Sequence, residues 1–172
     1  MKAIIPLLIA AGAGVAAAQP REAGANAIDV SSQAFPANAP IPGEYTCDGE
    51  EAAPQLAWTP PPNGTRSVAV LVDDPDAPRG VFTHWLVTGI ASSTTELPRG
   101  GALPDGAVAA ANGKGKHGYA GPCPPTGMHH YHFRVYALDL ALPRTMTASQ
   151  FRSAIQGHVL AQGELIGTYE RK

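Results

Sequence analysis

Three histidines lie within four positions of one another in the segment GPCPPTGMHHYHFRVYAL, which spans residues 121–138. Imidazole groups can bind a metal ion, transfer protons or donate hydrogen bonds to an anion. In a β-strand, neighbouring side chains point to opposite faces. The alternation therefore predicts that His129 and Tyr131 point into the interior, whereas His130 and His132 face water or a subunit contact.

The pair His130 and His132 could supply two metal ligands from one strand face. A zinc site needs three or four protein ligands, and no third ligand follows at a diagnostic spacing. A solvated strand face explains these two side chains better than a metal site does. We therefore expect neither a metal ion nor another cofactor.

Three carboxylates follow a second apolar strand, in the segment VAVLVDDPDAPRGVFTHWLVTGI at residues 68–90. The apolar run leads directly into Asp73, Asp74 and Asp76. The neighbouring prolines restrict the backbone and donate no hydrogen bonds. This pattern predicts a stiff acidic corner at the end of a buried strand.

Another histidine, His84, follows this corner on the next predicted strand. It shares a strand face with Phe82 and Leu86, so we expect it to point inward. Taken alone, an inward histidine is more often a packed core residue than a ligand. The nearby Asp74 favours a ligand-binding role for His84, because a buried carboxylate holds neighbouring imidazoles oriented and partly charged.

Backbone donors are sparse in the run PCPP at residues 122–125, because proline has no N–H group. Cys123 is the donor that remains in this run, and Gly121 just before it allows a ligand to approach closely. These features suit the capture of an anion. A plain proline-rich turn has the same composition and is the alternative.

The first 18 residues have the pattern of a cleavable export signal. They combine Lys2, an apolar run and small residues up to Ala18, after which we predict cleavage. A membrane anchor is the alternative, but Pro6 and two glycines interrupt the run, which is shorter than the roughly 20 apolar residues that span a bilayer. The sequence therefore predicts a periplasmic or secreted protein without stable membrane insertion.

Cys47 and Cys123 are the two cysteines of the chain. An exported protein meets an oxidising compartment, where an even number of cysteines favours disulfide formation. We therefore predict a disulfide between them. Two buried thiols that do not meet are the alternative.

The charge balance excludes one class of partner. The formal net charge is −2, and no run of Lys or Arg is present to follow a phosphate backbone. We therefore expect no nucleic-acid binding. Residues 19–172 have the length of one domain with its own core.

The distribution of Gly, Pro and short alternating apolar runs is typical of a mainly β domain. Apolar residues at helical spacing predict one helix over residues 147–162, with Thr147 or Ser149 as its N-cap and Gly163 after its end. The predicted strands span residues 27–32, 55–58, 67–73, 82–90, 129–139 and 164–169.

The two segments together resemble the signature blocks of the phosphatidylethanolamine-binding protein family, also called Raf kinase inhibitor-like proteins. DDPDAP, THWLV and GPCPPTGMHHYHFRVYAL follow those blocks in order, and YTCDGE, PQLAW and HVLAQGELIGTYER resemble the bacterial and archaeal branch. The resemblance covers nearly all of residues 28–171. It implies an antiparallel β-sandwich with a C-terminal helix, few peripheral helices and a small pocket at one end of the central sheet.

Within this resemblance, Cys123 stands where many eukaryotic members have a glycine whose N–H contacts the anion. His130 stands where the family usually has arginine, which removes the basis for a salt bridge from that position. The stretch between DPDAP and THW is short, so the kinase-contacting surface of eukaryotic relatives is not expected here. The residues that match pocket positions of the family are Asp74, His84, His129 and Tyr131.

The resulting prediction is a protein that binds phosphate, phosphorylethanolamine or a similar small anion and is not an enzyme. An inhibitor or modulator of a protein partner, with an unused pocket, is the first alternative. A hydrolase that uses histidine and aspartate is the second, but no nucleophile motif such as G-x-S-x-G is present. The choice between a monomer and a homodimer stays open. The predicted ligand-binding residues are Asp74, His84, Gly121, Cys123, His129 and Tyr131.

Overall fold

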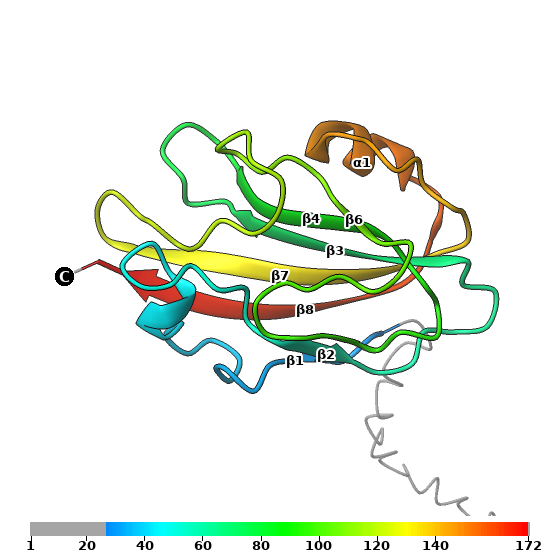
Figure 1. Ribbon diagram of the computed structural model, residues 1–172, viewed down its shortest axis with the longest axis horizontal. Helices are drawn as coiled ribbons and strands as arrows, with labels where there is room; N and C mark the ends of the chain where they lie inside the picture. Colours follow the sequence, from blue (N-terminus) through cyan, green and yellow to red (C-terminus); the bar gives the residue numbers. More distant parts are fainter. Residues whose placement is uncertain (1–26, 172) are drawn as a thin grey trace, which may run out of the picture.

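The computed structural model describes residues 27–171, which form two antiparallel sheets that pack face to face (Figure 1). The larger sheet has the strand order β6-β4-β3-β7-β8, and the smaller sheet has the order β1-β2-β5. The predicted export signal at residues 1–18 lies outside the described residues. Within residues 27–171, no helix combines the length and the apolar character needed to cross a membrane.

The larger sheet consists of β3 (Ser67–Asp74), β4 (Phe82–Ile90), β6 (Val108–Ala109), β7 (Met128–Leu138) and β8 (Val159–Glu170). The smaller sheet consists of β1 (Val30–Ser31), β2 (Leu56–Trp58) and β5 (Glu96–Leu97). A 3-10 helix, η1 (Gly43–Tyr45), and an α-helix, α1 (Ala148–Ala154), complete the elements of the described residues. The prediction of an antiparallel, mainly β fold with a helix near the C-terminus is confirmed.

Each of the six predicted strands overlaps a strand of the structure. The two-residue strands β5 and β6 lie outside the predicted strands. Two residues are too short to show an alternating pattern, so these strands carry no periodic signal in the sequence.

Strand β3 lies at the centre of the larger sheet and is buried at all eight of its positions. Its residues Val70 and Val72 face the smaller sheet and belong to the same apolar cluster as Trp58 of β2. Leu71 faces the other way and belongs to the cluster that contains Phe151 of α1. The sheet is therefore covered on both sides, which explains the uninterrupted apolar sequence of this strand.

Helix α1 is shorter than the predicted helix over residues 147–162. Its start agrees with the prediction, because Thr147 accepts a hydrogen bond from the N–H of Gln150 and forms a capping box with it. The helix ends at Ala154, and the chain turns at Gly157, where φ is 78°. The apolar residues that follow belong to β8, so their helical spacing was misleading.

Gly163 was predicted to follow the end of a helix, and this prediction is wrong. The residue lies within β8, paired with Val135 of β7. A Cβ atom at this position would collide with the carbonyl oxygen of Ile28. The glycine therefore allows the first described segment of the chain to lie directly against β8.

Three connections meet at one end of the larger sheet, at the left of Figure 1. They are the turn between β3 and β4, the loop that leads into β7 and the segment that contains η1. Helix α1 lies toward the other end of the molecule in this view. The candidate site is formed where the three connections meet.

Candidate functional site

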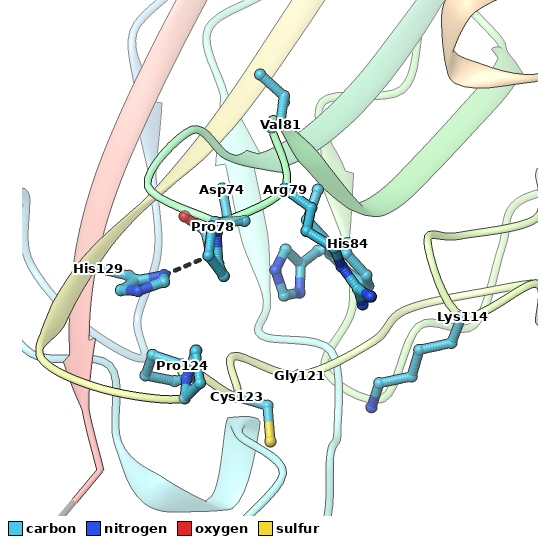
Figure 2. A pocket seen from close by; sticks show the side chains of 14 residues that line it. Asp74, Pro78, Arg79, Val81, His84, Lys114, Gly121, Cys123, Pro124 and His129 are labelled. Atoms are coloured by element: carbon cyan, nitrogen blue, oxygen red, sulfur yellow. Dashed lines mark hydrogen bonds and ion pairs between the residues drawn. The ribbon is translucent and has the colours of Figure 1, made fainter.

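A cavity of about 440 Å³ opens at this end of the larger sheet (Figure 2). Its volume lies within the range of small-molecule sites. Residues from the end of β3, from β4 and from the loop before β7 line it, although they are far apart in the sequence. The predicted site residues that line the cavity are Asp74, His84, Gly121, Cys123 and His129.

Asp74 ends β3 and accepts hydrogen bonds at both of its carboxylate oxygens. Nδ1 of His129 donates to Oδ2 at 2.7 Å (Figure 2), and the N–H of Asp76 donates to Oδ1 at 2.9 Å. The side chains of Asp74 and His129 are both less than one-tenth exposed. Because Nδ1 of His129 carries the proton of this bond, the tautomer leaves Nε2 available to a ligand.

A β-bulge turns His84 toward the cavity. In the pairing of β3 with β4, Val72 lies opposite Trp85, but the next residue, Asp73, lies opposite Thr83. His84 is therefore an extra residue between two paired positions. Bulges of this kind re-aim side chains and are common next to functional sites.

His84 lines the cavity. However, the argument that led to this prediction, a strand face shared with both Phe82 and Leu86, was wrong. Phe82 and His84 do lie together, with ring centroids 4.7 Å apart. Leu86, which alternation placed on the same face, packs on the opposite side of the sheet in the cluster that contains Phe151. The bulge breaks the two-residue period between Leu86 and Phe82.

A backbone carbonyl orients His84, in contrast to the predicted orientation by Asp74. Nδ1 of His84 donates to the carbonyl oxygen of Ala120 at 2.6 Å, and the N–H of Ala120 donates to the carbonyl oxygen of His84 at 2.9 Å. Burial lowers the pKa of His84 below its ordinary value of 6.5, while the Ala120 carbonyl and the charge of Asp74 oppose this shift. His84 is therefore a neutral imidazole at pH 7, and its Nε2 is an acceptor.

The backbone around Cys123 forms a tightly held wall of the cavity. The predicted disulfide between Cys47 and Cys123 is present, with a Cα–Cα distance of 5.4 Å. The N–H of Cys47 also donates to the carbonyl oxygen of Pro122 at 3.0 Å. A Cβ atom on Gly121 would come within 2.8 Å of the Thr46 carbonyl carbon, so glycine permits the two segments to touch.

Tyr131 lies behind the cavity and is not part of its surface. Its ring packs edge-on against His84 and roughly parallel to His129, with centroid distances of 5.1 and 6.5 Å. Burial raises the pKa of Tyr131, the charge of Asp74 adds to this shift, and the nearby N–H of Cys123 opposes it. The phenol is therefore neutral at pH 7.

The hydroxyl of Tyr131 has an unusual environment. Within residues 27–171 it is the single buried side-chain nitrogen or oxygen atom without a hydrogen-bond partner. Buried polar groups in proteins are nearly always paired, so an exception of this kind requires an explanation.

Two cationic side chains at the cavity, Arg79 and Lys114, were missed by the sequence analysis (Figure 2). Arg79 lies in the turn between β3 and β4, and Lys114 lies in the loop before β7. The only signal for them in the sequence is a basic residue next to glycine in each turn-rich stretch. The apolar part of the lining, formed by Phe82 and several prolines, was also missed.

His130 and His132 point away from the cavity, as the alternation predicted. Nδ1 of His130 bonds to Asp76 and Nδ1 of His132 bonds to Glu164, each at 2.8 Å. The two imidazoles thus have separate carboxylate partners. In the part of the chain that the structure describes, no three His, Cys, Asp or Glu side chains are grouped so that they could hold a metal ion.

Comparisons with known proteins agree with this architecture. The sequence model of the family described as "Phosphatidylethanolamine-binding protein" matches residues 31–170. A "UPF0098 protein" of Methanothermobacter thermautotrophicus is 45% identical over 150 residues, which cover 84% of this chain and 99% of the relative. A Mycobacterium tuberculosis relative whose name describes it as a lipoprotein, LppC, is 41% identical over 150 residues, which cover 85% of this chain and 74% of the relative.

Two crystal structures have a similar fold. The Chlamydia trachomatis protein CT736, described as a phosphatidylethanolamine-binding protein homologue, has a TM-score of 0.79 and 38% identity, over 86% of this chain and 99% of that chain. Escherichia coli YbcL has a TM-score of 0.78 and 32% identity, over 84% of this chain and 99% of that chain. The fold is a β-sandwich of this type. The chain belongs to the phosphatidylethanolamine-binding protein family.

Proposed function

We propose that the protein binds a small phosphorylated anion, such as phosphate or a phosphorylethanolamine-type group, in this cavity. The observation that carries the proposal is the hydroxyl of Tyr131, which has no partner within residues 27–171. A buried donor without an acceptor costs free energy in the unliganded protein. An anionic oxygen that enters between His84 and His129 would accept this hydrogen bond.

Other groups support an anion at the same place. The N–H of Cys123 lies near the Tyr131 hydroxyl, so one oxygen could accept from both. Arg79 and Lys114 bring positive charge to the cavity, and hydrogen bonds from cations to phosphate are strong. Nε2 of His84, an acceptor at pH 7, suits a protonated phosphoryl oxygen or a ligand ammonium group.

We infer that this binding occurs without turnover. The His129–Asp74 pair has the geometry of an acid–base dyad. However, the described residues that line the cavity include no serine or threonine, and Cys123 is held in a disulfide. The described lining therefore offers no side-chain hydroxyl or free thiol as a nucleophile.

We also propose that the protein works outside the cytoplasm. Disulfides persist mainly in oxidising compartments, and the name of the mycobacterial relative describes a lipoprotein.

At the cavity rim, Val81 is 58% exposed, which would suit contact with a protein partner. Ligand binding would then modulate that contact.

The substitution Tyr131→Phe tests the proposed function, because it should have opposite effects on the free and the bound protein. Loss of an unpaired buried hydroxyl should raise the free energy of unfolding by about 1 kcal/mol. Loss of the donor should weaken the binding of inorganic phosphate by about tenfold, because hydrogen bonds to charged groups are strong. Thermal unfolding across a phosphate titration measures both effects.

His130→Ala is the matched control, since His130 is a neighbouring residue on the outward face of β7. It should leave the phosphate-dependent stabilisation as in the wild type. A wild-type protein that gains no stability from phosphate or phosphorylethanolamine would contradict the proposed function.

A further inference from the structure

The two cationic side chains at the cavity differ in their partners. Arg79 makes no ion pair within residues 27–171, whereas Nζ of Lys114 donates to Oε1 of Glu51 at 2.9 Å. Glu51 does not line the cavity, so its carboxylate reaches Lys114 from outside. One of the two charges that would attract an anion is therefore already neutralised by the protein.

The loop that carries Lys114 is held in place by Asn112. The side-chain oxygen of this buried residue accepts from the N–H of Lys114 at 2.9 Å, and its side-chain nitrogen donates to the carbonyl oxygen of Gly118 at 3.0 Å. The N–H of Gly113 donates to the carbonyl oxygen of Thr83 in β4 at 2.8 Å. Lys114 thus extends from a fixed base beside the cavity (Figure 2), and its flexible ammonium can change partners without movement of the loop.

Glu51 has an uncommon backbone conformation. Its φ is 51°, in the left-handed region that residues other than glycine, asparagine and aspartate rarely adopt. The hydrogen bond from Lys114 lowers the pKa of Glu51, and the Gly121 N–H contributes to the same shift. The carboxylate is therefore ionised at neutral pH. It lies next to Glu50, which pairs with a different cation, Arg99, at 2.9 Å.

We propose that Glu51 competes with the ligand for Lys114 and thereby sets the affinity of the cavity for anions. Both side chains of the pair are 41% exposed, and exposed ion pairs are weak. A phosphoryl group can therefore take Lys114 from Glu51. The ammonium then exchanges one anionic partner for another, so it adds less to affinity than Arg79 does, which has no ion-pair partner within residues 27–171.

This competition also favours ligands of high charge. A singly charged anion attracts the Lys114 ammonium no more strongly than Glu51 already does, whereas a phosphate dianion attracts it more strongly. Glu51 is thus a residue that acts on the ligand through Lys114. The inference rests on the proposed function, because Glu51 would compete with the anion proposed for this cavity.

The substitution Glu51→Gln removes the competing charge and keeps the length of the side chain. We expect the Kd for inorganic phosphate, measured by titration calorimetry, to fall by about three- to fivefold. The dependence of Kd on salt should become steeper, because Lys114 is released to act on the ligand. Glu50→Gln is the matched control: it removes the same charge one residue away and should change Kd by less than about twofold.

Lys114→Met separates competition from a general effect of charge. On this background, Glu51→Gln should no longer change Kd, because the shared cation is gone. Two results would overturn the competition and leave the proposed function intact. The first is a Kd that is unchanged or higher in Glu51→Gln than in the wild type. The second is a decrease of Kd by Glu51→Gln that is as large in the Lys114→Met background as in the wild type. If neither the wild type nor Glu51→Gln binds phosphate, the proposed function and this inference both fail.

Discussion

The pairs His129–Asp74 and His130–Asp76 have the same chemistry at neighbouring positions but lie in different surroundings. Their nitrogen–oxygen distances are 2.7 and 2.8 Å. The side chains of the first pair are 8% and 6% exposed, and those of the second are 51% and 42% exposed. The difference arises because neighbouring residues of β7 point to opposite faces of the sheet.

Burial, and not the bond itself, decides what each pair can do. At the surface, water screens the charges and offers other partners, so such a pair adds little to stability. Inside the cavity wall, both side chains have lost their water, and each depends on the other. Only the buried pair can hold an imidazole in one orientation for a ligand.

The greatest loss of stability is expected when a buried pair is broken at its carboxylate. Asp74→Ala leaves His129 buried without its partner and should lower the free energy of unfolding by about 3–5 kcal/mol. Asp76→Ala should lower it by less than about 1 kcal/mol, because His130 can bond to water. Chemical denaturation of the two variants measures the difference.

Equal losses of stability in Asp74→Ala and Asp76→Ala would contradict the role given to burial. Asp74→Asn sharpens the test, because the amide can still accept the hydrogen bond from His129 but carries no charge. Its loss of stability should lie between that of Asp74→Ala and that of the wild type.

A smaller effect is expected when the cavity wall is loosened. The disulfide joins residues 76 positions apart, and its removal by the paired substitutions Cys47→Ser and Cys123→Ser should cost about 2–4 kcal/mol of unfolding free energy. The stabilisation by phosphate should also decrease, because the Cys123 N–H is no longer held in place. Unfolding with and without phosphate separates the two losses.

The exposed pair His130–Asp76 provides the control for this experiment. Removal of the disulfide should leave the effect of Asp76→Ala unchanged, since Asp76 and His130 bond to each other and not to the wall. A phosphate response that survives the loss of the disulfide in full would show that the wall does not need this cross-link.

The smallest expected effect is a dependence on pH through His84. Burial lowers the pKa of His84 in the folded protein below 6.5, with Asp74 opposing the shift and Lys114 adding to it. Below about pH 6.5, the unfolded chain therefore binds more protons than the folded chain does. The free energy of unfolding should fall as the pH drops through this range, by at most about 1.4 kcal/mol per pH unit.

His84→Gln should reduce this dependence, because glutamine does not titrate. Denaturation curves collected from about pH 8 down to about pH 5 measure the slope for both proteins. A variant with the full wild-type slope would show that other groups cause the acid sensitivity.

Much of the fold and part of the site could be predicted from local patterns. The alternation in β7 correctly divided His129 and Tyr131 from His130 and His132, because the period of a strand depends only on backbone geometry. The two cysteines were paired correctly because no other pairing was open to them. The end of α1 was not predicted, since apolar spacing in a short stretch fits both a helix and a strand.

Local patterns were sufficient to predict which side chains of β7 face inward and that an acidic corner follows β3. The folded chain was needed to reveal the bulge that turns His84, the carbonyl of Ala120 that orients it and the pairing of Lys114 with Glu51. These features depend on the register between segments that are far apart along the chain. Local sequence sets the period of a strand, but the partner strand sets where that period is interrupted.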